Sequence, residues 1–144
     1  MIKERFKVVA AVHIFLLKEN DILLLRRFNT GYEDGKYSVL AGHLDGDEDL
    51  IEAAQREILE EGGVNVSYSE LNVVGVMHRK AVEERIDFFL TCDKWEGEVK
   101  NMEPHKCDNL SWFPLDNLPE NIIPYVRTAI DNYKNNKPFD IYGF

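Results

Sequence analysis

Acidic side chains are concentrated in one short stretch of this sequence. Residues 45–61 contain eight acids and a single base, Arg56, so this segment carries −7 of the chain's formal net charge of −9. A diffuse negative surface favours solubility, whereas acids gathered in one segment are typical of a cation-binding site. The same charge argues against a long nucleic acid as partner, because such partners require a basic stripe. The acids are Asp45, Asp47, Glu48, Asp49, Glu52, Glu57, Glu60 and Glu61.

Three of these carboxylates, Glu57, Glu60 and Glu61, share one side of a predicted helix. Residues 50–61 are helix formers with apolar side chains at helical spacing, and Gly62-Gly63 ends the pattern. At roughly 100° per residue the three glutamates span an arc of about 100° beside the apolar stripe. Like charges at this spacing repel, and Mg²⁺, which prefers carboxylate oxygens, would relieve the repulsion. A solvated acidic face would look the same, so further tests are needed.

The string Asp-Gly-Asp-Glu-Asp at residues 45–49 invites comparison with a calcium-binding EF-hand loop. That loop needs glycine at its sixth position and glutamate at its twelfth. This chain has Leu50 and Arg56 there. The EF-hand interpretation is therefore excluded.

A longer pattern does fit. Gly42 is followed after five residues by Glu48, and after seven more by Arg-Glu-Ile-Leu-Glu-Glu-Gly-Gly-Val at residues 56–64. Residues 42–64 thus resemble the Nudix box at every fixed position, and the flanks resemble MutT-like members. The resemblance implies a Nudix fold and a Mg²⁺-dependent hydrolase. It also implies cleavage of a phosphoanhydride bond in a nucleoside diphosphate linked to a group X, with a nucleoside triphosphate as the leading substrate.

The resemblance implies a role for each charged residue of the box. Glu60 and Glu61 match the metal-binding pair, and Glu48 matches a glutamate in or next to the metal site. Glu57 is expected either to bind the metal or to orient and deprotonate the attacking water. Arg56 is expected to hold Glu57 in place through bidentate bonds. Mg²⁺ is the expected cofactor, with Mn²⁺ as the alternative.

Outside the box the resemblance adds three residues. Glu103 matches a late glutamate of MutT that reaches the metal or acts as the base. Arg27 matches an arginine that contacts phosphate, so we expect it to bind substrate. Ala41 stands where the family has a glycine whose backbone carbonyl binds the metal. Two further positions lie in the loop at the start of the box, before the helix. Gly42 is expected to serve the conformation of this loop. Asp47 replaces a common glycine and is expected to reshape the loop.

Hydrophobic patterns predict the elements that position these residues. Strands are predicted at residues 6–17, 22–27, 37–40, 71–78, 86–91 and 110–113, and helices at residues 50–61 and 124–133. This order favours a mixed α/β (α+β) domain, with a mixed sheet between helices. Together with the box, it predicts a single Nudix domain over residues 1–144, folded as an α/β/α sandwich.

Composition limits the classes of protein. At 144 residues and 44% hydrophobic content, the chain can bury a core without disulfides. The apolar run at residues 8–17 is too short to span a membrane and lacks a cleavage site. Cys92 and Cys107 lack metal-type spacing, which favours reduced thiols. We therefore expect a cytoplasmic protein with a small-molecule nucleotide substrate and no membrane partner; a homodimer is left open.

Three functions remain compatible with the sequence. The first is a MutT-like nucleoside triphosphate pyrophosphohydrolase. The second is an ADP-ribose or nucleotide-sugar pyrophosphatase. The third is a catalytically idle Nudix domain that senses a ligand, which the complete box disfavours because a sensor does not need so many carboxylates. RNA decapping is disfavoured by the lack of a basic patch, and the sequence does not identify X.

Overall fold

The computed structural model describes residues 3–144, so the first two residues of the predicted 1–144 domain lie outside the described residues. The described part contains eight strands, two α-helices and one short 3₁₀ helix. In chain order these are β1 (Val9–Lys18), β2 (Asp21–Arg27), β3 (Tyr37–Ser38), β4 (Leu40–His43), α1 (Leu50–Gly62), η1 (Tyr68–Glu70), β5 (Asn72–Lys80), β6 (Glu84–Cys92), β7 (Cys107–Pro114), α2 (Pro124–Lys134) and β8 (Phe139–Tyr142).

The strands form one mixed sheet in the order β3-β2-β1-β6-β5-β8, with β4 added to β1 and β7 added to β2. β1 is the centre of this sheet because it pairs with three neighbours. It runs parallel to β6 along most of its length and antiparallel to β4 at residues 11–14, and its last two residues pair with β2. This pairing sets β4, with the first residues of the box, directly beside the middle of the sheet.

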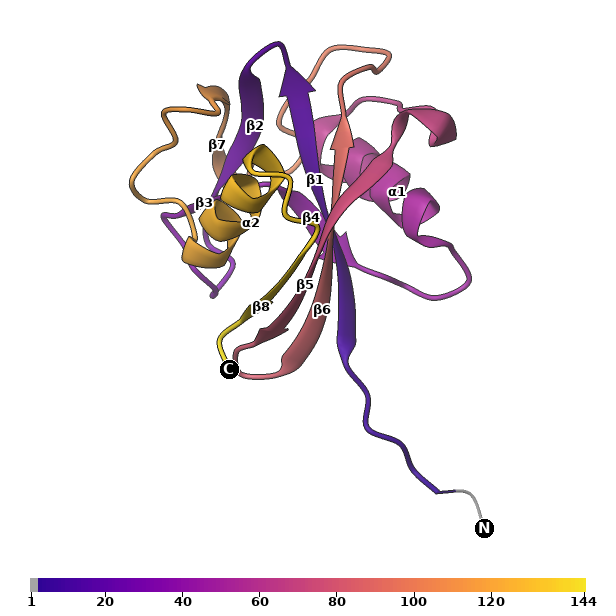
Figure 1. Ribbon diagram of the computed structural model, residues 1–144. Coiled ribbons are helices and arrows are strands. Elements are labelled where there is room, and N and C mark those ends of the chain that lie inside the picture. The colour runs from indigo at the N-terminus through magenta and orange to yellow at the C-terminus, as the bar shows by residue number, and fades with distance from the viewer. Residues whose placement is uncertain (1–2) are drawn as a thin grey trace.

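The helices cover opposite faces of the sheet (Figure 1). Alternate residues of β1 point to alternate faces, as a strand requires. Ile14 and Leu16 pack in the cluster that contains Ile58 of α1, whereas Phe15 packs in the cluster that contains Ile130 of α2. Each such fully buried side chain contributes about 1.5–3 kcal/mol of transfer free energy. The predicted mixed α/β fold with a sheet between helices is confirmed.

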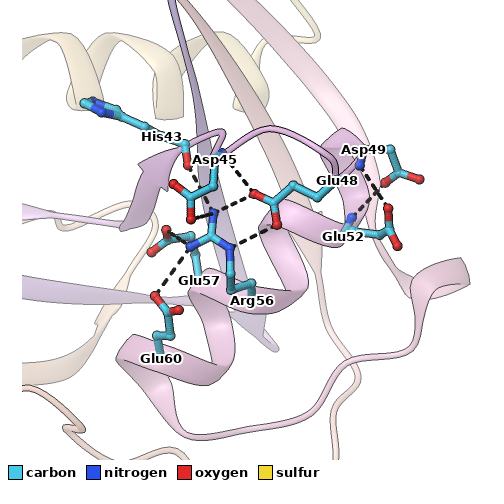
Figure 2. Close-up of polar contacts among 8 residues, drawn as sticks. All are labelled: His43, Asp45, Glu48, Asp49, Glu52, Arg56, Glu57 and Glu60. Carbon is cyan, nitrogen blue, oxygen red and sulfur yellow. Dashed lines mark hydrogen bonds and ion pairs between the residues drawn. The ribbon is translucent and has the colours of Figure 1, made fainter.

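α1 is closed at both ends by local interactions. The Asp49 carboxylate accepts a 2.8 Å hydrogen bond from the Glu52 backbone N–H, and the Glu52 side chain accepts one of 2.9 Å from the Asp49 backbone N–H (Figure 2). Such a reciprocal capping box stabilises the start of a helix. Gly63, with φ of 73°, ends the helix in the left-handed conformation. Two of the eight clustered acids therefore serve the helix rather than a cation.

The sheet differs from the prediction in two places. The predicted strand at residues 37–40 is two strands: β3 pairs with β2, and β4 pairs with β1 and continues to His43. Strand β8 was not predicted; its four residues pair in parallel with β5 at the sheet edge. Both pairings join segments far apart in the sequence. None of the helices within residues 3–144 is long and apolar enough to cross a membrane.

Candidate active site

A cleft of about 530 Å³ lies beside α1, between β2, β4 and the segment that precedes β7. We call it the carboxylate cleft. Three glutamates from α1 line it together with one from the segment before β7, and a single arginine faces them from the end of β2. The predicted site residues that it brings together are Arg27, Ala41, Glu57, Glu60, Glu61 and Glu103.

Arg56 lies at the centre of a network of oxygen acceptors at the edge of this cleft (Figure 2). Its Nε and Nη2 donate to the two carboxylate oxygens of Glu48, at 3.0 and 2.7 Å. Its Nη1 donates to Glu57 Oε1 at 2.7 Å. These bonds raise the pKa of Arg56, so its charge is permanent. Arg56 also contacts the His43 carbonyl (3.1 Å), Asp45 (3.3 Å) and Glu60 (3.5 Å).

Glu48 is therefore a partner of Arg56 in this structure, and it is not among the residues that line the cleft. The Arg56 hydrogen bonds lower the pKa of Glu48, so the pair is fully charged near neutral pH. Glu48 was expected to lie either in the metal site or next to it, and this geometry agrees better with a position next to it. A bidentate pair of this kind holds the guanidinium in one orientation, and so fixes the nitrogen that reaches Glu57.

Glu57 is buried, with 8% of its surface exposed, and its carboxylate lies against Gly42 of β4. A Cβ atom at position 42 would overlap that carboxylate. Gly42 has no positive φ, so the expectation that it serves the loop's conformation is wrong. Glycine is needed there because it leaves room for Glu57. Burial raises the pKa of Glu57, although Arg56 opposes the shift.

Glu61 points from the last turn of α1 towards the same strand. Its Oε1 accepts a 2.8 Å hydrogen bond from the Ala41 backbone N–H. Burial raises the pKa of Glu61 well above its ordinary value, and the nearby charges of Glu57 and Glu103 raise it further. Ala41 itself has no positive φ, so alanine fits where the family has glycine. The lining of the cleft thus holds more carboxylates than positive groups, with four glutamates against Arg27 and Lys106.

Glu103 and Arg27 face this cluster from the other elements of the cleft. Glu103 is held at its backbone, where its N–H donates to Asn101 Oδ1 at 3.0 Å. The Arg27 guanidinium is oriented by the loop that follows β2, because it donates to the Tyr32 carbonyl at 2.6 Å and to Thr30 Oγ1 at 3.1 Å. An arginine fixed in this way can meet phosphate oxygens with little loss of side-chain entropy.

The residues present fit a magnesium ion. No three His, Cys, Asp or Glu side chains within residues 3–144 lie close enough together to enclose a metal by themselves. Mg²⁺ does not need such a cage, because it usually keeps several waters and takes one or two carboxylates together with substrate phosphates. Four glutamates against Arg27 and Lys106 give the lining of the cleft an excess of negative charge, which such a cation would reduce. Nudix hydrolases generally use divalent metals.

Other residues occupy positions that the sequence did not reveal. Asp47 adopts a left-handed φ of 58°, so it takes a glycine-like conformation at the position where the family often has glycine. His43 contacts Arg85 rather than the cleft. Trp112 stacks on Trp95, and neither lines the cleft. The role of Asp45 beside Arg56 could have been suspected from the local crowding of acids.

An α/β/α sandwich with a glutamate-bearing helix beside an arginine defines a class of domain that can hold a cation against phosphates. Residues 7–133 match the family model of the NUDIX domain. The chain therefore belongs to the Nudix family, as the box at residues 42–64 predicted.

Solved MutT proteins share this fold. A MutT NUDIX hydrolase from Burkholderia pseudomallei superposes with a TM-score of 0.80 at 24% identity, covering 88% of this chain and 98% of that one. The MutT protein from Methanosarcina mazei Go1 gives a TM-score of 0.78 at 22% identity, covering 92% and 97%. At these identities the likeness shows the fold, which is that of the MutT-like branch.

A curated relative is similar in sequence. The NAD-capped RNA hydrolase NudC of Shigella dysenteriae serotype 1 is 28% identical over 121 residues, which make up 84% of this chain and 44% of that protein. The chain thus spans less than half the length of this relative. What the relative acts on therefore bears on this chain as a proposal.

Proposed function

We propose that this chain is a Mg²⁺-dependent Nudix hydrolase that cuts a phosphoanhydride bond in a nucleoside diphosphate linked to a group X. The observation that carries the proposal is the convergence of four carboxylates and Arg27 on one cleft. Carboxylates alone would repel a polyphosphate, whereas a divalent cation between them would attract it. We also propose that residues 1–144 act as a single Nudix domain.

The metal would be held by Glu57, Glu60 and Glu61, and when bound it would neutralise charge on the phosphate oxygens and lower the pKa of a coordinated water. Arg27 would donate hydrogen bonds to the phosphates from the opposite wall of the cleft. Arg56 acts from outside the cleft, since its bond to Glu57 keeps that carboxylate at one position against β4.

Two carboxylates are suited to accept the proton of the attacking water. Glu57 is buried, and its raised pKa makes it a stronger base than an exposed glutamate. Glu103 lies on a segment outside the helix and reaches the cleft from another side. No covalent intermediate is needed, because positioning and electrostatic stabilisation can account for phosphoryl transfer of this kind.

A nucleoside triphosphate is the leading substrate within this proposal. ADP-ribose or a nucleotide sugar is the second, and the relative named as an NAD-capped RNA hydrolase favours testing dinucleotides as well. A ligand-sensing domain without activity is the third. The site keeps its carboxylates, its arginine and the partly buried Arg56–Glu57 pair at the edge of the cleft, which a sensor would not require.

The test is a panel of nucleoside triphosphates, ADP-ribose, nucleotide sugars and NAD, with Mg²⁺ or with EDTA, followed by chromatography of the products. Reaction in ¹⁸O-labelled water identifies which phosphorus atom is attacked. We expect cleavage of at least one compound with Mg²⁺ and none with EDTA. The Glu60→Gln, Glu61→Gln double variant, purified in the same way, is the control. Cleavage that survives EDTA, or no cleavage of any compound, would refute the proposal.

A further inference from the structure

A second cavity, of about 310 Å³, adjoins the carboxylate cleft. It is lined by residues of β1, β2, β4, β5, β6 and the start of α2, together with Tyr32 of the loop after β2. Arg27 and Ala41 line both cavities, so a molecule bound in one can extend into the other. We call the second cavity the arginine pocket, after the residues that distinguish it: Arg27, Arg79 and Arg85, with Tyr32, His43 and Tyr125.

The arginine pocket gathers three guanidinium groups, those of Arg27, Arg79 and Arg85, in a chain whose net charge is −9. Each of them has acids nearby. Asp87, which is completely buried, accepts from Arg79 Nε at 2.6 Å, and the more exposed Glu83 lies 3.6 Å from Arg85 Nη1. The charge of Arg27 acts on Asp34 and Glu61. The pocket is therefore distinguished by its guanidinium donors rather than by an excess of positive charge.

The inner wall of the pocket is rigid. The Arg79 guanidinium lies 3.6 Å from the centre of the Tyr125 ring, and the Tyr125 hydroxyl is 3.1 Å from His13 Nε2. Arg79 has 4% of its surface exposed and His13 2%. Charged and aromatic groups packed in this way are fixed before a ligand arrives, which reduces the entropy lost on binding.

Arg85 has donor capacity that the protein leaves unused. Its side chain is 18% exposed, and its Nε is buried without a hydrogen-bond partner. Its Nη2 meets the His43 imidazole. A buried donor without an acceptor is unfavourable for folding, and a site for an acceptor-bearing ligand gives a reason to keep it. Arginine carries no acceptor of its own, so the pocket is built mainly to donate hydrogen bonds.

We propose that the arginine pocket binds an anionic substituent, a carboxylate or a phosphate, on the group X of the substrate. The inference rests on the proposed function, because it assumes a pyrophosphate in the carboxylate cleft. The planar guanidinium matches both anions through paired hydrogen bonds. The volume of the pocket falls at the lower end of small-ligand sites, which are about 300–1,000 Å³. A neutral X without acceptors would leave the Arg85 Nε donor unpaired.

Two pairs of nucleotides test this proposal. UDP-glucose and UDP-glucuronate differ by a carboxylate on X, and ADP-ribose and ADP-ribose 1″-phosphate differ by a phosphate on X. Binding is measured by titration calorimetry with Ca²⁺ in place of Mg²⁺, because Ca²⁺ also takes carboxylate and phosphate oxygens, and chromatography checks that the nucleotide stays intact. The pyrophosphate is common to both members of a pair, so its contribution cancels in the ratio of dissociation constants. We expect the anionic member of at least one pair to bind about tenfold or more tightly, as a charge-assisted hydrogen bond predicts.

The Arg85→Gln variant should bring that ratio close to one, and Arg85→Lys should keep part of it. Arg5→Gln, which removes one positive charge from the exposed N-terminal segment, is the matched control and should leave the ratio unchanged. Equal affinities within both pairs, no binding of either anionic member, or equal effects of Arg85→Gln and Arg5→Gln would overturn the inference. The proposed function fails on a separate measurement, the absence of Mg²⁺-dependent cleavage.

Discussion

Replacing Gly42 with alanine would add one methyl group at the point where β4 meets the Glu57 side chain. The new Cβ atom would overlap both the carboxylate carbon and its oxygens. Backbone strain does not contribute, because Gly42 has no positive φ. Glu57 would therefore have to leave its position, and its 2.7 Å bond from Arg56 would be lost.

The structure separates the two consequences of this change. The group that must move is the end of a flexible side chain, so we expect a loss of folding free energy within the ~1–3 kcal/mol typical of overpacking. If Glu57 is the proton acceptor or a metal ligand, its displacement should lower kcat by about a hundredfold or more. Steady-state kinetics and urea unfolding measure the two effects independently.

Gly62→Ala is the matched control for Gly42→Ala. Gly62 lies in the same helix as Glu57. A Cβ atom at position 62 would meet Leu40 Cδ1 of β4 at 3.5 Å, an ordinary contact distance. If Gly42→Ala has the same kinetics as Gly62→Ala, the reasoning is refuted. A double-mutant cycle adds a second check. In a Glu57→Asp background the side chain is shorter, so the penalty of Gly42→Ala on kcat should shrink; an unchanged penalty would show that Glu57 does not transmit the effect.

Three further predictions follow from the site and its surroundings. Glu60→Gln and Glu61→Gln should each lower kcat by at least about a hundredfold and reduce the gain in melting temperature on adding Mg²⁺; near-normal turnover in either would remove that residue from the metal site. Glu103→Gln should lower kcat with little change in melting temperature, whereas Glu98→Gln, at an exposed position five residues earlier, should do little; the reverse order would show that the segment was aligned wrongly. Burial lowers the pKa of His13 from 6.5 to about 4. Between pH 4 and 6.5 the folded state therefore binds fewer protons than the unfolded state. The contribution of His13 to the free energy of unfolding is fully present above pH 6.5 and is lost as the pH falls towards 4, by roughly 2 kcal/mol between pH 7 and 5. His13→Gln should flatten this part of the stability profile in urea titrations, and an unchanged profile would contradict the assignment.

Local patterns in the sequence determined much of the molecule. The predicted helix at residues 50–61 differs from α1 by one residue, because apolar spacing, the acid cap and the Gly62-Gly63 stop all act within a few residues of each other. The same holds for the Nudix box, whose spacing identified the family. The order of strands and helices along the chain was enough to predict a mixed sheet between helices.

Tertiary structure decided what no short window of sequence contains. It gave Gly42 a packing role against Glu57. It also placed β8 beside β5, and Glu103 in one cleft with the box glutamates. The arginine pocket was not predicted from the sequence because its residues come from five strands, one helix and a loop. His13 and Tyr125, hydrogen-bonded in its wall, lie 112 positions apart; their meeting depends on the order and register of the strands, which the whole fold sets.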